Sequence, residues 1–501
     1  MAVPTLGTLK TGSSNTDSQG TATGLDQSRR RTWIVFAILI IAFALRVVAA
    51  GNWHAATIES GRLFRLGDSD SYWVLASHIA RGEPYEYGSS DASIFRAPLY
   101  PLVLAPITLI ADPAEGVWVA RLLGCAAGTF SVWLVMQLAN FLANLMQLQS
   151  LLKSRNLLHA DLWAGVLAAI YPGAIGMSIM VLSEAIFCPL MLLILMGWCW
   201  LLGERAGRAV ALVSVATGMA SGLAILARPS WLLFMPLASL MILTLHPRRA
   251  VQARRIALIA LGCASVMAPW WLRSAQLTHR WVPTTLQVGA SLYDGLHPGA
   301  SGGSDENMEF VREFIVEQRA ADAAWESRQE VTQASQDWED WQGAQESPAE
   351  RHSPDSSTAN QLTERSSFEY RLNARMQSAA VDWVRENVSG AFRLSLVKFA
   401  RTWSLWPNAG EFGSTPMRLV LTLSCFSVLF CAAWVSWRYR KTAAGVIAMC
   451  WLPAVYFTLL HMVFVGSIRY REPAMLVLTA LAGCALSRIP IFQRQTRKSL
   501  D

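Results

Sequence analysis

The stretch RRRTWIVFAILIIAFALRVVAA, residues 29–50, decides the fold. From Trp33 to Ala50 it is predominantly apolar over the length that crosses the hydrocarbon core of a bilayer as a helix. The three arginines directly before this run predict a cytoplasmic N-terminus, because cytoplasmic flanks of membrane spans carry an excess of Lys and Arg. No small-residue cleavage site follows, so we expect the helix to stay in the protein instead of leaving as a signal peptide.

The composition of the whole chain agrees with a membrane protein. Of its 501 residues, 53% are hydrophobic and 15% are charged, and the mean hydropathy is +0.31. The apolar residues come in blocks of roughly 17 to 25, a length that suits spanning helices and not the alternating strands of a barrel. We therefore predict an all-α polytopic membrane protein.

Two other classes of protein are disfavoured by the arrangement of charges and cysteines. The net charge of +7 comes from Lys and Arg in short segments between the apolar blocks, so we expect no nucleic-acid partner. The 8 Cys are scattered and form no CxxC pair, which argues against a disulfide framework and against a zinc site. We expect neither a metal nor another cofactor.

The apolar blocks predict about ten spans, oriented by the basic clusters between them, with both termini in the cytoplasm. The block Leu99–Ala111 is short and is broken by prolines, so we expect a juxtamembrane or re-entrant segment there. The predicted spans are Trp33–Ala50, Val117–Leu145, Leu162–Leu182, Ala185–Leu202, Ala209–Leu226, Trp231–Leu245, Ile256–Leu272, Pro416–Trp437, Ala443–Val465 and Pro473–Leu486.

This topology divides the chain into five parts. Helical spacing of apolar residues from Tyr370 onward predicts an amphipathic helix within the larger external segment. The parts are a disordered cytoplasmic tail (1–28), a transmembrane module (29–273) with an external loop (51–97), a second external loop (274–413) with a polar insert (304–366), C-terminal transmembrane helices (414–488) and a cytoplasmic tail (489–501).

Charged residues gather at the outer ends of the predicted spans. A single charge at a membrane boundary is inexpensive, so interfacial anchoring is the simplest interpretation of any one of them. Their convergence on one side indicates a site instead. They are Asp68, Asp70, Arg96, Glu184, Arg228, Arg273, Arg469, Arg471 and Glu472.

The first external loop contains LGDSDSYWVLASHIARGEPY, residues 66–85. Tyr72, Leu75, Ala76 and Ile79 form the apolar face of a predicted helix that ends at Gly82, with Asp68 or Ser69 as its N-cap. Asp68 is equally suited to capping and to taking a proton from an acceptor hydroxyl or amine. A cation shared by Asp68 and Asp70 is only weakly indicated, because two carboxylates make an incomplete ligand set.

The segment SIRYREP, residues 467–473, places two arginines at the outer mouth of the last span. Guanidinium groups pair with phosphate oxygens, so Arg469 and Arg471 can stabilise a phosphate leaving group. Anchoring at the interface is the alternative.

A family resemblance rests on the order of several motifs. GDSDSY, ARGEPY and FRAPLYP resemble the first external loop of the family 39 glycosyltransferases of the GT-C class, which include protein O-mannosyltransferases and lipid A aminoarabinose transferases. LSEAIF (182–187), ARPSWLL (227–233), the run from Pro269 to Gly303 and IRYREP (468–473) follow in the same order. The match covers most of the chain outside the N-terminal tail and the polar insert.

The resemblance implies a GT-C-like bundle and an inverting transferase whose donor is a sugar on a polyprenyl phosphate. Asp68 matches the family's catalytic base, Arg96 stands where aminoarabinose transferases carry Lys, and Glu184 matches an acid common in bacterial members. Nothing resembles the beta-trefoil insert of the protein mannosyltransferases. The expected substrate-binding residues are Asp70, Tyr72, Arg96, Glu184, Arg228, Arg273, Arg469, Tyr470 and Arg471.

The sequence thus predicts a glycosyltransferase in a bacterial-type inner or plasma membrane, active on the non-cytoplasmic side. Its partners are the lipid-linked sugar, membrane lipids and an acceptor of unknown class. The alternative is a polyprenyl-lipid transporter or flippase, which would place charges at mid-membrane and show repeat symmetry. Neither feature is found in the sequence.

Overall fold

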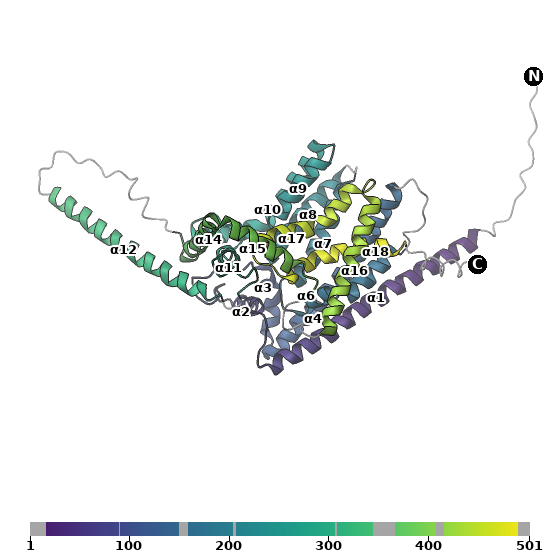
Figure 1. The fold of residues 1–501 in the computed structure, drawn as a ribbon, viewed down its shortest axis with the longest axis horizontal. Helices are drawn as coiled ribbons and strands as arrows, with labels where there is room; N and C mark the ends of the chain where they lie inside the picture. Colours follow the sequence, from purple (N-terminus) through teal and green to yellow (C-terminus); the bar gives the residue numbers. More distant parts are fainter. Residues whose placement is uncertain are drawn as a thin grey trace, which may run out of the picture.

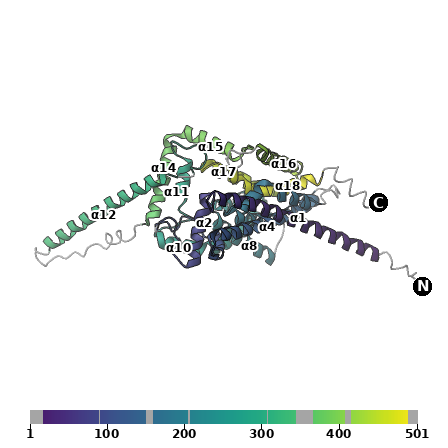
Figure 2. The same cartoon turned by 90° about the horizontal axis from the view of Figure 1, so that it is seen from below.

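The computed structural model describes residues 17–89, 91–149, 159–203, 207–305, 308–343, 366–406 and 415–488. Every regular element within these ranges is a helix, which confirms the all-α prediction. Most of the helices pack into one bundle, while α12 (Phe310–Gly343) and the beginning of α1 (Asp17–Glu59) project from it in different directions (Figure 1). The view from below shows the same two projections (Figure 2).

Seven helices of the described ranges are long and apolar enough to cross a membrane. They are α1, α4 (Pro113–Gln149), α7 (Glu184–Leu201), α8 (Arg208–Ala227), α10 (Arg249–Thr278), α16 (Thr415–Tyr439) and α17 (Ala444–Val463).

The predicted span Leu162–Leu182 is broken. It forms α5 (Ala160–Ile170) and α6 (Pro172–Ile179), which meet at an angle of 58° and together make an eighth crossing if they count as one span. Pro172 supplies no backbone N–H and so cannot continue α5. The freed carbonyl oxygens of Ala168 and Ala169 accept hydrogen bonds from Arg46 of α1, at 3.2 and 3.3 Å.

Of the about ten predicted spans, seven are single helices of sufficient length within the described residues, and the bent pair α5 and α6 would make an eighth. The predicted spans Trp231–Leu245 and Pro473–Leu486 become α9 (Phe234–Leu245, 12 residues) and α18 (Glu472–Leu486, 15 residues). A helix of 15 residues is about 22 Å long, shorter than the hydrocarbon core. Nearly every residue of α18 is buried, so this helix is surrounded by protein and does not depend on lipid contact.

The tails also differ from the prediction. Helix α1 begins at Asp17, so residues 17–28 of the expected disordered tail are helical, while residues 1–16 lie outside the described residues. The polar insert 304–366 contributes α12, and its residues 344–365 lie outside the described part, as do residues 489–501.

Helices α8 and α10 approach each other through glycines. A Cβ added to Gly218 of α8 would lie 2.0 Å from the Ile259 carbonyl oxygen, and one on Gly262 of α10 would lie 2.3 Å from that of Val215. Backbone therefore touches backbone, as small residues allow between membrane helices. The residue after the end of α8 is Arg228.

Shorter helices form the two loops that the sequence predicts to be external. The predicted helix in the first loop is α2 (Gly67–Arg81), in which Tyr72, Leu75 and Ala76 are buried and which ends at Gly82 with φ of +70°. The N-cap prediction is wrong, because Leu66 occupies that position and no side chain caps the helix. The other short elements are α3 (Leu99–Leu104), η1 (Ala105–Leu109), η2 (Pro229–Trp231), α11 (Val288–Gly295), α14 (Phe368–Glu386), α15 (Val388–Thr402) and η4 (Ile468–Arg471).

The amphipathic helix predicted from Tyr370 is confirmed as α14. The side chain of Ser367 caps it by accepting a hydrogen bond from the Tyr370 amide at 3.3 Å. Met376 and Ala380 are buried on its inner face. Glu369, in the first turn, accepts backbone N–H groups of the first external loop, so α14 ties the two external loops together.

Candidate active site

Asp68 lies in the first turn of α2, where the positive end of the helix dipole favours a carboxylate. Its two oxygens are bound by different arginines: Oδ1 lies 2.7 Å from Arg96 Nη2, and Oδ2 lies 3.1 Å from Arg469 Nη1. About a third of its side chain is exposed (34%), so a ligand can reach the carboxylate. Asp68 is thus held by two cations and not by a helix cap.

The arginines determine the charge of Asp68. Burial acts to raise the pKa of Asp68, but the nearby guanidinium groups of Arg96 and Arg469 outweigh it and hold the pKa at about 2. Asp68 is therefore ionised at neutral pH and accepts hydrogen bonds.

Glu184, the first residue of α7, is fully buried and has two cationic partners. Its Oε1 lies 2.6 Å from Arg469 Nε and 2.6 Å from Arg228 Nη1. A buried carboxylate is tolerated only when it is paired and hydrogen-bonded, and these two contacts meet that requirement. Arg469 bridges Asp68 and Glu184.

The resulting cluster is a chain of five charged groups, Arg96, Asp68, Arg469, Glu184 and Arg228. Three guanidinium groups against two carboxylates leave an excess of one positive charge. Such an excess suits an anionic ligand, because a phosphate supplies the missing negative charge. The cluster unites segments that are far apart in the sequence.

Polar neighbours orient Arg96. Its Nε donates to Ser71 Oγ at 3.0 Å, and its Nη1 donates to Gln287 Oε1 at 2.8 Å. The guanidinium carbon of Arg96 lies 5.3 Å from the ring centre of Tyr72, and the Tyr72 hydroxyl donates to Ser183 Oγ at 3.4 Å. Tyr72 therefore contacts the cluster, and its predicted role in substrate binding stays a prediction.

Tyr470 forms an aromatic wall beside the cluster. Its ring lies 5.6 Å from the Arg228 guanidinium carbon and stacks on His461, with ring centres 3.8 Å apart and planes inclined by 2°. Nδ1 of His461 lies 3.0 Å from the Val465 carbonyl oxygen, which fixes the ring. The predicted site residues include none of His461, Gln287, Ser71 and Ser183. Nothing in their local sequence signals these long-range contacts.

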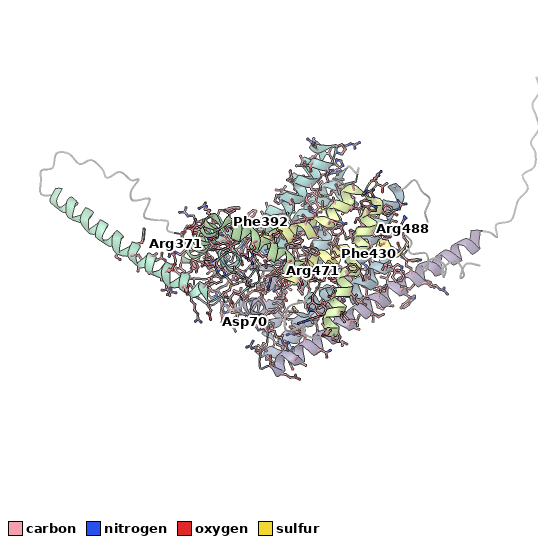
Figure 3. The ribbon with its side chains drawn as sticks, in the orientation of Figure 1. Asp70, Arg371, Phe392, Phe430, Arg471 and Arg488 are labelled. Carbon is pink, nitrogen blue, oxygen red and sulfur yellow. The ribbon has the colours of Figure 1, made fainter. Side chains whose placement is uncertain are left out.

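Three residues of the predicted set lie outside the cluster. Asp70 accepts a hydrogen bond from the Tyr87 hydroxyl at 3.4 Å. Arg273 donates to the Ser93 carbonyl oxygen at 2.9 Å and lies over the rings of Tyr85 and Trp270. Arg471 is the third, and Figure 3 places it closer to the middle of the bundle than Asp70.

Arg471 corrects the expectation that both arginines of SIRYREP face one cleft. It is buried, and its Nη1 donates to the carbonyl oxygens of Thr402 and Ser404 at 3.2 and 2.7 Å. Its Nε lies 3.4 Å from Glu472 Oε1. Within the turn of η4, positions 469 and 471 point to different neighbours, so only Arg469 joins the cluster.

Among the described residues, no three His, Cys, Asp or Glu side chains come together at a spacing that holds a metal ion. The independence of the reaction from a metal stays a prediction. The cluster contains two carboxylates, each already engaged by arginines.

No family model matches the chain. No curated protein matches it. Among solved structures, the chain is similar to the archaeal oligosaccharyltransferase AglB from Archaeoglobus fulgidus, in complex with an inhibitory peptide and a dolichol-phosphate. The identity is 15% and the TM-score 0.49; the match covers 94% of this chain and 52% of that one, so this chain spans about half of that protein's length.

Proposed function

We propose that this protein is a membrane glycosyltransferase that moves a sugar from a polyprenyl-phosphate donor to an acceptor at the non-cytoplasmic face of the membrane. The observation that carries the proposal is one accessible, ionised carboxylate, Asp68, held between Arg96 and Arg469. Such a reaction needs a base for the acceptor and cations for the phosphate, and both are present in the cluster. The motifs GDSDSY, FRAPLYP and IRYREP resemble family 39 of the GT-C class, which points the same way.

The proposed reaction is a single displacement. The acceptor hydroxyl or amine attacks the anomeric carbon of the sugar while its proton passes to the Asp68 carboxylate. The bond between the anomeric carbon and the phosphate oxygen breaks, and its electron pair leaves with the polyprenyl phosphate. Because attack and departure take place on opposite faces, the configuration is inverted, and Arg469 stabilises the phosphate as its charge grows.

The bridge through Arg469 couples donor binding to the strength of the base. A carboxylate with a pKa of about 2 is a weak base, and the ideal value lies near the working pH. A donor phosphate competes with Asp68 for the Arg469 guanidinium group. When Arg469 turns to the phosphate, Asp68 loses a cationic partner and its pKa rises, so the base becomes effective only once the donor is bound.

The polyprenyl chain of the donor lies between helices or against their lipid-facing sides, since an isoprenoid tail is as apolar as the membrane. The seven long apolar helices support an integral multi-pass protein. We propose a bacterial-type inner or plasma membrane as its location.

The test uses the full chain in lipid nanodiscs with radiolabelled polyprenyl-phosphate sugars and a panel of acceptor extracts. We expect labelled product from the wild type and a loss of about 10³-fold in Asp68→Asn, the middle of the range for removing a general base. The matched control is Asp70→Asn, two residues away and outside the cluster, which should keep its activity. Equal activity of Asp68→Asn and wild type would show that Asp68 is not the base.

The same protein in vesicles separates the enzyme from a transporter. A flippase would move the labelled lipid across the bilayer without cleaving the sugar from its phosphate. Labelled lipid that changes leaflets but yields no glycosylated product would overturn the transferase proposal.

A further inference from the structure

Helix α15 presents two chemically different faces. Leu394, Lys398 and Thr402, spaced four residues apart, are buried against the bundle. On another side of the helix a stripe of large apolar side chains is exposed: Val388 (67%), Phe392 (66%), Leu396 (49%) and Phe399 (45%). Their spacing of four, four and three residues puts them on one narrow face. Figure 3 shows Phe392 at the outer edge of the bundle.

The chain leads from α15 to α16, a helix that is long and apolar enough to span a membrane. Just after α15, the Trp406 ring lies 5.7 Å from the guanidinium carbon of Arg418, in the first turn of α16. The helix α16 then exposes Leu423, Phe426 and Phe430 along its length, as a lipid-facing span does. The apolar surface of α15 is therefore adjacent to a surface that acyl chains cover.

The charges of α15 suit the same occupant. The helix has no Asp or Glu, and its exposed basic residue is Arg393, whereas Lys398 is buried. Helices that lie in a membrane interface combine an apolar stripe with basic residues, which meet the lipid phosphates. Lipid is preferred over a protein partner because the segment after α15 contacts α16, a helix that is long and apolar enough to span a membrane and exposes large apolar side chains.

The buried face of α15 holds the segment that carries Arg469. Lys398 Nζ donates to the Val463 carbonyl oxygen at 2.6 Å, and Arg401 Nε donates to that of Gly466 at 3.4 Å. From the other direction, Arg471 donates to the Thr402 carbonyl oxygen at 3.2 Å. These three contacts surround the backbone from 463 to 471.

The contact between α15 and this segment leaves no free space. A Cβ added to Gly466 would lie 2.4 Å from the Lys398 carbonyl oxygen. A displacement of α15 must therefore move the backbone shortly before Arg469. The position of that guanidinium group relative to Asp68 and Glu184 follows the position of α15.

We propose that α15 is an interfacial helix whose stripe of Val388, Phe392, Leu396 and Phe399 contacts membrane lipid, and that through Lys398 and Arg401 the bilayer fixes the position of Arg469. The second half of this statement rests on the proposed function, and the first half does not. Each half therefore has its own measurement.

Lipid contact is tested with nitroxide spin labels in nanodiscs. Labels at Phe392→Cys and Leu396→Cys should collide mainly with oxygen, which concentrates in lipid, and little with a water-soluble nickel chelate. The control label at Arg385→Cys, on the exposed side of α14, should show the opposite preference. The unmutated protein, with its 8 native cysteines, is labelled in parallel to measure the background.

Collision of the 392 and 396 labels with the nickel chelate would show that water covers the stripe. Protection from both reagents would show that protein covers it. Either result overturns the lipid contact, whether or not the protein transfers a sugar.

The coupling is tested with Lys398→Met, which removes the bond to Val463 and leaves the exposed stripe unchanged. The probe is binding of polyprenyl phosphate alone, which requires no catalysis. We expect the affinity to fall about tenfold while the 392 label still reports lipid and the protein remains folded in a thermal melt. The matched control is Lys441→Met, an exposed lysine just beyond the end of α16, which should bind normally. Unchanged affinity in Lys398→Met would show that α15 does not position Arg469, which overturns the second half of the proposal.

Discussion

Arg469 Nε lies 2.6 Å from Glu184 Oε1, although 285 positions separate these residues in the chain. The contact joins the start of α7 to the turn before α18, two helices that pack in the core of the bundle. Glu184 has no exposed surface, so it cannot exchange this partner for water. The pair therefore has both a structural and a chemical consequence.

Glu184→Gln should destabilise the protein. The substitution leaves Arg228 and Arg469 without the charge that both contact, and breaking a buried ion pair costs about 3–5 kcal/mol. Unfolding followed by intrinsic fluorescence in detergent checks the loss. Glu115→Gln, at an exposed position at the start of α4, is the matched control and should unfold like the wild type. An unaltered unfolding midpoint in Glu184→Gln would contradict the buried bridge.

Arg469→Lys and Arg471→Lys should fail in different ways. Arg469 uses two nitrogens to reach two carboxylates, which a single ammonium group does not reproduce, so transfer should fall about 10²-fold. Arg471 contacts backbone carbonyl oxygens, so its replacement should lower the melting temperature by several degrees. The rate of transfer should fall less than it does in Arg469→Lys. Parallel measurement of kcat, KM and melting separates the two. The same changes in kcat, KM and melting temperature in both variants would contradict the different roles of Arg469 and Arg471.

The stability should depend on pH through Glu369. Burial raises the pKa of Glu369 to about 7, against the opposing effect of hydrogen bonds from the Ile94 and Ser93 amides. Between its ordinary pKa of 4.5 and about 7, the folded protein holds a proton that the unfolded chain has released. Its free energy of unfolding therefore falls as the pH rises through this window, by up to about 3 kcal/mol.

Melting curves at pH 5 and pH 8 check this dependence. Glu369→Gln is permanently neutral, so its melting temperature should vary less between the two pH values than that of the wild type. A variant with the wild-type slope would show that another group is responsible.

The sequence was most informative where a local pattern is enough. The apolar blocks, the buried face of α2, its end at Gly82 and the amphipathic α14 follow from residue spacing and the left-handed preference of glycine. The structure also brings together Asp68, Arg96, Glu184, Arg228, Arg469 and Tyr470 of the predicted set. Their catalytic and binding roles stay predictions.

The features that could not be predicted depend on distant partners. Arg469 and Arg471 look equivalent in SIRYREP, and only the position of α15 decides that Arg471 meets backbone carbonyl oxygens. The carbonyl oxygens of Ala168 and Ala169 at the break before Pro172 are bound by Arg46, which lies more than a hundred residues earlier. Hydropathy identifies the predicted span Pro473–Leu486 as apolar, but it does not distinguish lipid around that segment from protein.

Gly218→Leu should separate α8 from α10. Its added Cβ alone would overlap the Ile259 carbonyl oxygen, which belongs to the backbone and cannot turn away. Overpacking of this kind costs about 1–3 kcal/mol or more. The control is Gly176→Ala on α6, where the added Cβ meets no neighbouring atom, so the substitution should be tolerated. Gly207→Ala is unsuitable as a control because Gly207 has a φ of +96°. A melting temperature of Gly218→Leu at or above the wild-type value would contradict the close approach.

The backbone contact between α8 and α10 means that one helix cannot shift toward the other. No side chain separates the two helices at Gly218 and Gly262, where the main chains themselves meet. Arg228 follows directly on the end of α8, and Trp270 and Arg273 lie in the last turns of α10. A bulky residue at Gly262 would push α8 away from α10 and should therefore shift Arg228, the residue that follows α8.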